Sequence, residues 1–273
     1  MKTVLITGSS SGIGRAIARY FQSKGWQVAA TMRKPENEQD LGRLDNTKLY
    51  ALDVCHKNSI QEAINSAISD FGGIDVIVNN AGYGLVGPFE ASTEEQIQRQ
   101  FDTNVFGLMH VTRAILPHFR KRKSGTIINI TSVGGRLSFP LYGLYNSTKW
   151  AVEGFSESLQ YELRQFAISV KLIEPGAIKT DFYDRSMDVI KREGLALYDD
   201  YVGRAFNNIQ DMGASAEGPE VVAKKTYKAA TDNSNRFRYP VGGNAPALLF
   251  LRRILPDNLF FMGIRKGVEK KRK

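Results

Sequence analysis

The sequence predicts a single α/β domain built on a doubly wound parallel sheet. Short apolar runs alternate with longer stretches in which apolar residues recur at helical spacing. Repeated strand-then-helix order is typical of a parallel sheet that carries helices on both faces. The runs themselves, such as Val76–Val78, are continuous rather than alternating with polar residues, which is typical of strands buried on both sides. The 273 residues contain no internal repeat and no dividing linker.

The expected elements follow one another along the chain. Apolar and β-branched runs predict strands over residues 2–7, 27–31, 48–52, 75–79, 126–131, 168–174 and 236–241. Helical spacing predicts helices over residues 13–24, 58–71, 94–122, 145–166 and 219–230. Pro117 predicts a break or kink near the end of the long helix. A last amphipathic helix is expected from Ala247 until Pro256 stops it.

Two segments fall outside this regular pattern, although residues 1–273 are expected to form one domain. Residues 181–218 are irregular and too long for a simple connection, so they are either a substrate lid or one or two added surface helices. Residues 244–273 form a C-terminal extension with a basic end. We expect that end to be solvated, and contact with a membrane or nucleic acid is the minor alternative.

The composition favours a soluble globular protein and argues against several other classes. No apolar run approaches the roughly 20 residues that a membrane span needs. The single cysteine, Cys55, excludes an intrachain disulfide framework, and with no signal peptide it favours the cytoplasm. The three histidines show no metal-ligand spacing, so no metal is expected. The formal charge of +9 suits a protein that attracts an anionic cofactor, and no nucleic-acid-binding pattern accompanies it.

A glycine-rich turn follows the first expected strand. It reads T-G-S-S-S-G-I-G and contains Gly8, Gly12 and Gly14. Glycine permits a tight turn and lets a phosphate approach the backbone, and the helix that follows directs free N–H groups at the anion. The spacing G-x-x-x-G-x-G differs from the common G-x-G-x-x-G. Its place at the first strand–helix junction nevertheless predicts a Rossmann-type dinucleotide site.

The end of the second strand indicates which dinucleotide is preferred. Dinucleotide folds that prefer NAD usually carry an acidic residue there for the ribose 2′-hydroxyl. This chain has Met32, followed by Arg33 and Lys34. An arginine can hold a 2′-phosphate through charge-assisted contacts, whereas an acid would repel it. The sequence therefore predicts a preference for NADP(H) over NAD(H).

The stretch Y-N-S-T-K, from Tyr145 to Lys149, opens an expected helix. Residues four apart on a helix lie on one face, so the phenol and the ammonium can point into the same cleft. A nearby cation lowers the pKa of a tyrosine, which is ordinarily near ~10. Such a tyrosine can act as a general acid or base on a carbonyl or an alcohol.

Taken together, these motifs resemble the short-chain dehydrogenase/reductase family in its compact single-domain form. The matching motifs are T-G-S-S-S-G-I-G at Thr7, D-V at Asp53, N-N-A-G at Asn79, N-V-F-G at Asn104, I-T-S-V-G-G around Ser132, Y-N-S-T-K at Tyr145 and E-P-G-A-I-K-T at Glu174. They occur in the family's order and spacing. The resemblance implies a seven-stranded sheet of order 3-2-1-4-5-6-7.

The resemblance also implies catalytic roles for four residues. Tyr145 is the proton donor and acceptor, and Lys149 holds the nicotinamide ribose and lowers the Tyr145 pKa. Ser132 hydrogen-bonds the substrate oxygen, and Asn104 supports a water that relays protons to Lys149. Two other serines are weaker candidates for the Ser132 role, namely Ser138 and Ser147.

Further contacts follow from the same resemblance. The expected cofactor contacts are Gly8, Ser10, Ser11, Gly12, Ile13, Gly14, Arg33, Asp53, Val54, Asn80, Ala81, Gly82, Tyr145, Lys149, Pro175, Gly176, Ile178 and Thr180. The expected substrate contacts are Ser132, Tyr145, Leu141, Tyr142 and Ala177. Wider pocket candidates are Val86, Val133, Leu137, Phe139, Phe182 and Tyr183. Because most of these are apolar, a lipophilic substrate is expected, and the C-terminal part is similar to hydroxysteroid and retinol dehydrogenase-like members.

The sequence therefore predicts an NADP(H)-dependent oxidoreductase that acts on a small-molecule carbonyl or alcohol. The alternative is a non-enzymatic dinucleotide sensor or scaffold on the same fold. An epimerase or dehydratase of the longer related family is disfavoured by chain length. The family resemblance also implies a homodimer or homotetramer, with pairing through the long helices that begin at Glu94 and Tyr145.

Overall fold

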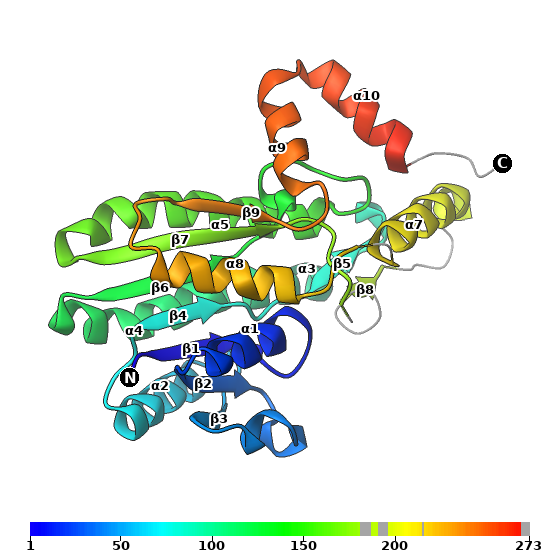
Figure 1. Ribbon diagram of the computed structural model, residues 1–273. Helices are drawn as coiled ribbons and strands as arrows, with labels where there is room; N and C mark the ends of the chain where they lie inside the picture. Colours follow the sequence, from blue (N-terminus) through cyan, green and yellow to red (C-terminus); the bar gives the residue numbers. More distant parts are fainter. Residues whose placement is uncertain (181–186, 191–195, 215, 269–273) are drawn as a thin grey trace.

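The chain folds around a seven-stranded parallel sheet, as the sequence predicts (Figure 1). The computed structural model describes residues 1–180, 187–190, 196–214 and 216–268. The strand order is β3-β2-β1-β4-β6-β7-β9, which is the expected order 3-2-1-4-5-6-7 when only the strands of this sheet are counted. These strands are β1 (Thr3–Thr7), β2 (Gln27–Met32), β3 (Thr47–Ala51), β4 (Val76–Asn79), β6 (Gly125–Ile130), β7 (Ile168–Pro175) and β9 (Arg238–Val241).

Helices cover both faces of this sheet. One face carries α1 (Gly12–Ser23) and α8 (Glu220–Thr231), which lie in front of the strands in Figure 1. The other face carries α2 (Lys57–Phe71), α4 (Leu108–Arg122) and α5 (Gly143–Leu163). The predicted helices thus form, and α5 begins two residues before Tyr145.

Each strand supplies side chains to both layers of the core. In β1, Val4 and Ile6 pack with Phe21 of α1, whereas Leu5 packs on the opposite face with Ile64 of α2. Successive side chains of a strand point to opposite faces of the sheet, so a strand buried on both sides must be apolar throughout. Full burial of one such side chain contributes about 1.5–3 kcal/mol, and this explains why the runs are continuous.

The long helix expected at residues 94–122 is interrupted. It consists of α3 (Glu94–Phe101), a π-helical turn (Asp102–Gly107) and α4. Thr93 starts α3 with a capping box, in which its hydroxyl accepts from the Gln96 N–H at 3.2 Å. Of the break or kink expected at Pro117, the break does not occur, because α4 continues through that residue to Arg122.

The two segments outside the sheet pattern contain helices that the sequence allowed for and elements that it did not predict. Within residues 181–218, β8 (Met187–Val189) pairs in parallel with β5 (Gly84–Val86), and α7 (Asp199–Ala214) follows. The candidates Phe182 and Tyr183 lie outside the described residues.

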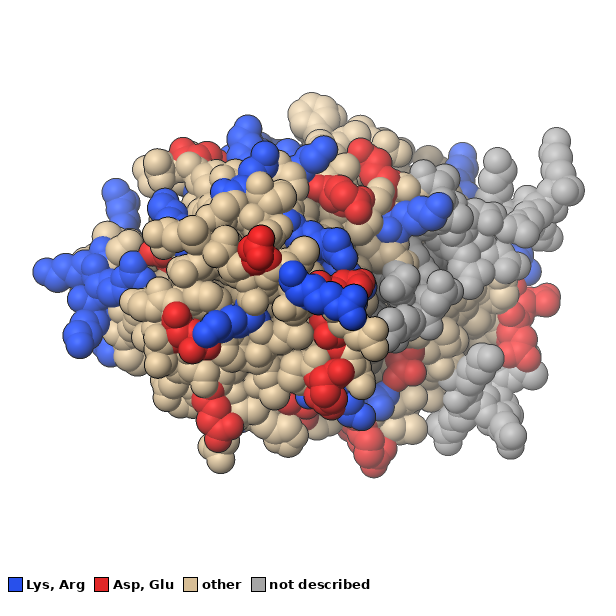
Figure 2. Space-filling view, turned by 60° about the horizontal axis from the view of Figure 1, so that its bottom comes forward, with Lys and Arg blue, Asp and Glu red and all other residues tan. Residues whose placement is uncertain are grey.

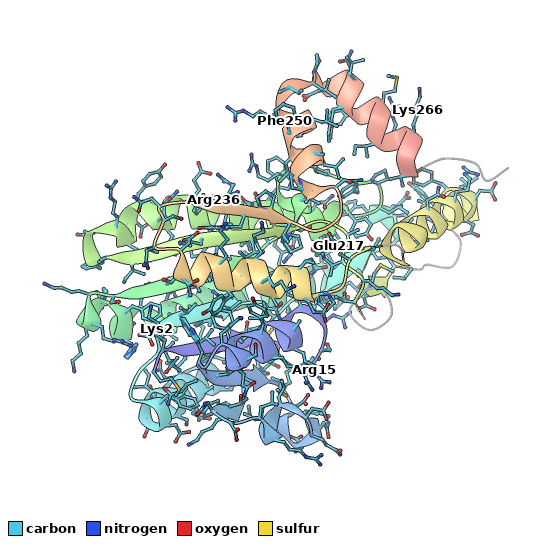
Figure 3. The ribbon with its side chains drawn as sticks, in the orientation of Figure 1. Lys2, Arg15, Glu217, Arg236, Phe250 and Lys266 are labelled. Atoms are coloured by element: carbon cyan, nitrogen blue, oxygen red, sulfur yellow. The ribbon has the colours of Figure 1, made fainter. Side chains whose placement is uncertain are left out.

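The C-terminal extension forms two helices rather than one. They are α9 (Ala245–Ile254) and α10 (Asp257–Val268), and they make a corner that stands out from the sheet (Figure 1). Phe250 on α9 and Lys266 on α10 are both exposed in this corner (Figure 3).

The surface charge is distributed rather than concentrated on the face shown in Figure 2. There, basic and acidic side chains are interspersed over most of the area, and basic ones gather toward one end. Within the described part of the chain, every helix is too short or too polar to span a bilayer.

Candidate active site

A cavity of about 1070 Å³ opens at the carboxyl ends of the central strands. Gly8 follows β1, Asn80 follows β4, Ser132 follows β6 and Gly176 follows β7, and all four line the cavity. Open α/β sheets bind their ligands at this edge. Every residue expected to contact the cofactor lines this cavity.

The glycine turn leaves room only for backbone. Gly8 and Gly12 have φ angles of +69° and +52°, which favour glycine. A Cβ atom on Gly14 would lie 2.2 Å from the Gly8 carbonyl oxygen and 2.5 Å from Asn80 Nδ2. The chain therefore folds tightly against itself here, and its N–H groups remain accessible to a ligand.

Neighbouring groups fix this turn in place. Asn80 Nδ2 donates to the carbonyl oxygens of Thr7 at 2.9 Å and Gly8 at 3.0 Å. Thr7 Oγ1 accepts from the Asn80 and Ala81 N–H groups at 3.0 Å each. At the start of α1, the Ser11 side chain makes no capping hydrogen bond. The first turn of α1 can thus direct its N–H groups and dipole at an anion, which fits a dinucleotide phosphate.

Of the two residues at the end of β2, only Arg33 faces the cavity. Arg33 is exposed, lines the cavity, and makes no ion pair within the described residues. Met32 is buried in the core beside α1, so it does not occupy the place of a ribose-binding acid. The nearby carboxylate of Glu38 is buried, pairs with Arg15 and accepts from the Leu41 N–H at 3.0 Å. The Arg33 guanidinium is therefore available to a ligand at the end of β2, whereas the Glu38 carboxylate is occupied by Arg15 and Leu41.

Tyr145 and Lys149 lie one turn apart on α5 and both line the cavity. The Lys149 Nζ atom is 5.6 Å from the centre of the Tyr145 ring. It donates to the Ile130 carbonyl oxygen at 3.0 Å and is buried. Burial lowers the pKa of Lys149 to about 8, and the Glu153 carboxylate opposes this shift. The ammonium is thus held beside the phenol in a weakly solvated place, where its charge acts strongly.

Ser132 stands at the end of β6 with its hydroxyl oriented. Its Oγ accepts from the Gly134 N–H at 3.0 Å and lies 3.4 Å from the Pro175 carbonyl oxygen. The other two candidates, Ser138 and Ser147, are exposed and do not line the cavity. The Ser147 hydroxyl instead donates to the Gly143 carbonyl oxygen within its helix at 2.8 Å.

Asn104 does not line the cavity but lies directly behind it, in the π-helical turn. Its Oδ1 accepts from the Tyr83 N–H at 3.0 Å, and its Nδ2 donates to the Tyr83 carbonyl oxygen at 2.8 Å. Nδ2 also reaches Thr148 Oγ1 at 3.2 Å. Asn104 therefore joins the Gly82–Tyr83 wall to the helix of Tyr145. The π turn, a feature common at functional sites, directs this side chain inward.

The substrate end of the cavity is largely apolar and includes groups from distant parts of the chain. Tyr142 and Ala177 line it as expected, and so does Phe139. Leu141 does not; it packs within the apolar cluster behind Tyr145 and has φ +66°.

Several lining residues were not expected, among them the ion pair of Arg99 and Asp188 and the apolar Met187 of β8, Leu248 of α9 and Val268 of α10. The amphipathic pattern after residue 247 was the only sequence signal for any of them. No cluster of metal-ligating side chains occurs among the residues that the structure describes.

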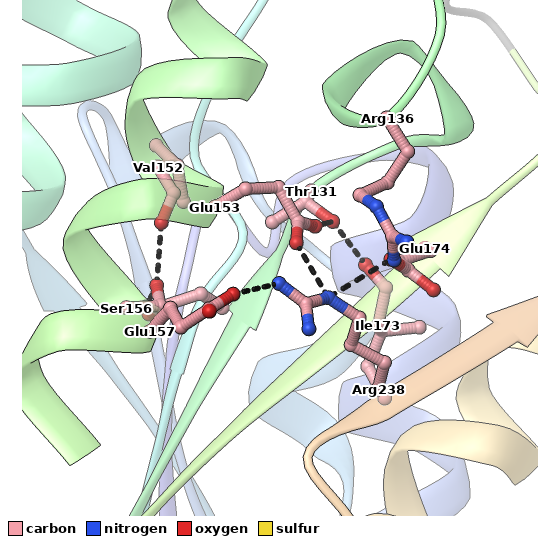
Figure 4. A network of polar contacts seen from close by, with 10 residues as sticks. Thr131, Arg136, Val152, Glu153, Ser156, Glu157, Ile173, Glu174 and Arg238 are labelled. Atoms are coloured by element: carbon pink, nitrogen blue, oxygen red, sulfur yellow. Dashed lines mark hydrogen bonds and ion pairs between the residues drawn. The ribbon is translucent and has the colours of Figure 1, made fainter. Parts of the chain in front are cut away.

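A network of charged side chains joins α5, β7 and β9 (Figure 4). Arg238 of β9 donates from Nε to Glu153 at 3.0 Å and from Nη2 to Glu157 at 2.5 Å. The same Nε lies 3.6 Å from Glu174 of β7. Arg136 also pairs with Glu174, at 3.2 Å. Nothing in the sequence indicated this network, because its five charged residues come from four separate segments: α5, β7, β9 and the turn after β6.

Comparisons with known proteins agree with this geometry. The family model described as short chain dehydrogenase matches residues 2–189. An uncharacterized oxidoreductase of Schizosaccharomyces pombe is 40% identical over 235 residues, which cover 86% of this chain and 98% of the relative. The 3-ketodihydrosphingosine reductase of Bacteroides thetaiotaomicron is 34% identical over 264 residues, which cover 96% of each chain.

Solved structures show the same similarity. A short-chain dehydrogenase from Streptomyces avermitilis is 34% identical, with a TM-score of 0.84 over 97% of this chain and 98% of the other. ElxO with NADP bound is 29% identical, with a TM-score of 0.72 over 90% and 99%. A short-chain dehydrogenase/reductase from Burkholderia phymatum in complex with NAD is 26% identical, with a TM-score of 0.79 over 96% and 95%. Proteins similar to this chain thus bind either dinucleotide.

Proposed function

We propose a specific reaction from one premise: this chain belongs to the short-chain dehydrogenase/reductase family and is an NAD(P)-dependent oxidoreductase. The proposed reaction interconverts a lipophilic carbonyl compound and its alcohol with NADP(H). The observation that carries this proposal is one shared cavity. The glycine turn and Arg33 lie at one end of it, and Ser132, Tyr145 and Lys149 lie in its wall.

Each of the three wall residues has a distinct task in this proposal. A bound NADPH supplies the hydride. The Ser132 hydroxyl turns its O–H from the long contact with the Pro175 carbonyl oxygen, at 3.4 Å, to the substrate oxygen, while the Gly134 N–H holds its oxygen in place. The Tyr145 phenol gives that oxygen its proton. The buried Lys149 ammonium stabilises the phenolate that remains.

Replacement of the phenol tests this mechanism. Tyr145→Phe removes the proton donor and little else, so turnover should fall by at least about a hundredfold while NADPH still binds. Turnover is followed by NADPH absorbance with a mixed set of carbonyls, and binding by fluorescence titration. A variant that retains wild-type turnover contradicts the mechanism. If neither protein turns over any carbonyl but both bind NADPH, the sensor alternative is favoured.

The cofactor preference rests on Arg33, which is exposed at the corner of the cavity. Arg33→Ala should weaken NADPH binding about tenfold or more and leave NADH binding nearly unchanged, because only the former carries a 2′-phosphate. Lys34→Ala is the matched control, since Lys34 is exposed but does not line the cavity. Equal weakening of both cofactors by Arg33→Ala contradicts the preference. The buried Met32 is unsuitable for this test because an acid there would disturb the core.

The lipophilic substrate is supported by Phe139, Tyr142 and Leu248 at the substrate end of the cavity. The relative named 3-ketodihydrosphingosine reductase also supports a lipid-like ketone. In a series of methyl ketones of growing chain length, kcat/KM should rise up to about fourfold per added methylene until the cavity is filled. A rate independent of chain length contradicts this substrate class.

We also propose self-association through the long helices. Phe106 in the π turn and Trp150 on α5 are both exposed aromatic residues in these helical segments. Light scattering at several concentrations measures the state, and Trp150→Ser should favour the monomer. A monomer at all concentrations contradicts the proposal.

A further inference from the structure

The charged network behind the cavity touches three parts of the catalytic wall. Glu153 is one helical turn after Lys149 on α5, so the two side chains share a face. Glu153 Oε1 accepts from Thr131 Oγ1 at 2.9 Å, and Thr131 immediately precedes Ser132. Glu174 immediately precedes Pro175, whose carbonyl oxygen lies 3.4 Å from Ser132 Oγ.

The Thr131 contact also joins β6 to β7. The Thr131 N–H donates to the Ile173 carbonyl oxygen at 2.8 Å, and its hydroxyl lies 3.0 Å from the same oxygen. Glu153 therefore holds the residue before Ser132 at the point where two strands end (Figure 4). A loss of this contact would free the end of β6, on which the Ser132 hydroxyl depends.

Two of the carboxyl groups in this network are buried. The side chains of Glu153 and Glu174 are 5% and 1% exposed, and Arg238 lies between them. Burial raises the pKa of both carboxyl groups, to about 7 for Glu174, where the Glu153 charge adds to the rise. The charged groups around Lys149 are thus Glu153 on its own helix, Arg136 after β6, Glu174 on β7 and Arg238 on β9. Glu153 is the nearest of these to Lys149 along α5.

We propose that Glu153, held by Arg238, is a positioning residue for the reaction: its carboxylate anchors the end of β6 beside Ser132 and keeps Lys149 protonated. This inference rests on the proposed function for its kinetic part. It assigns a role to a buried acid that touches neither substrate nor cofactor. A purely structural role for Glu153 would leave the pH dependence of turnover unchanged.

The test is the pH profile of kcat/KM for Glu153→Gln, which keeps the shape and one acceptor of the side chain. Loss of the anion makes the Tyr145–Lys149 pair release its proton more readily, so the alkaline limb should move to lower pH by roughly one unit. Glu157→Gln is the matched control, because Glu157 binds the same Arg238 but is half exposed. The alkaline limb of the Glu157→Gln profile should stay within a few tenths of a pH unit of the wild-type limb. Glu153→Asp keeps the charge, so its alkaline limb should lie close to that of the wild type.

An unmoved limb in Glu153→Gln, or an equal shift in Glu157→Gln, overturns the proposal. A second measurement needs no turnover and separates this proposal from the proposed function. In urea unfolding at pH 7, Glu153→Gln should lower the midpoint more in the wild-type background than in the Lys149→Met background. The reason is that Lys149→Met has already removed the interaction between the charges of Glu153 and Lys149. Equal losses in both backgrounds also overturn the proposal.

Discussion

The charged Lys149 should lower the free energy of unfolding of this protein. Its pKa falls from 10.5 to about 8 through burial, which corresponds to about 3 kcal/mol of unfavourable free energy for the charged form. Met is apolar and of similar length, so Lys149→Met removes this cost. It also removes the hydrogen bond to the Ile130 carbonyl oxygen, which is worth about 1–2 kcal/mol. The variant should therefore be inactive yet more stable by about 1–2 kcal/mol at pH 7.

The pH dependence gives the sharper result. The folded pKa lies below the unfolded one, so the unfolded state binds more protons between pH 8 and 10.5. The unfavourable contribution of Lys149 is complete below pH 8 and disappears as the pH rises through 10.5. At pH 9.5 about half of it is gone, so the advantage of Lys149→Met should vanish there. Urea unfolding of both proteins without cofactor at pH 7 and 9.5 measures this difference.

A second buried lysine provides the control. Lys171 pairs with Asp232 at 2.8 Å and donates to the Ala229 carbonyl oxygen at 2.8 Å. Lys171→Met breaks a buried ion pair, so it should destabilise the protein by about 3 kcal/mol. A Lys149→Met protein that is less stable than the wild type at pH 7, or a stability difference that does not change with pH, refutes the reasoning.

Two further predictions concern the glycine turn and the Lys171–Asp232 pair. Gly14→Ala should lower NADPH affinity by at least about tenfold and stability by about 1–3 kcal/mol, because the new Cβ would lie 2.2 Å from the Gly8 carbonyl oxygen; isothermal titration and urea unfolding measure the two effects, and unchanged affinity contradicts the assigned site. Burial alone raises the pKa of Asp232, but the Lys171 ammonium and other hydrogen bonds outweigh burial and hold it well below its usual range. The stability from this carboxylate is present above its unfolded pKa and lost as the pH falls below about 4. Asp232→Asn should thus lose several kcal/mol at pH 7 and a moderately smaller amount at pH 3, because the folded carboxylate is still ionised there, and a loss that does not depend on pH contradicts this assignment.

Local sequence patterns were sufficient to predict most of the sheet and to single out candidate catalytic residues. The strand order followed from the motif resemblance, and the buried strands from their continuous apolar runs, because a residue buried on both sides of a sheet has no polar option. Ser132 was singled out by the motif resemblance, and Tyr145 and Lys149 also by their spacing of one helical turn; all three line the cavity. The preference for Ser132 over Ser138 and Ser147 also agrees with their exposure.

The sequence by itself determined the strands and the class of fold, because strand burial and helical spacing are local properties of the chain, and its motifs supplied the strand order and the candidate catalytic residues through the family resemblance. Only the tertiary structure decided how distant segments meet. It turned Met32 into the core and Arg33 outward, placed Asn104 behind the cavity through a π turn, and brought Arg238 between Glu153 and Glu174. These contacts depend on the packing of whole elements against one another, and no spacing within one segment encodes that packing.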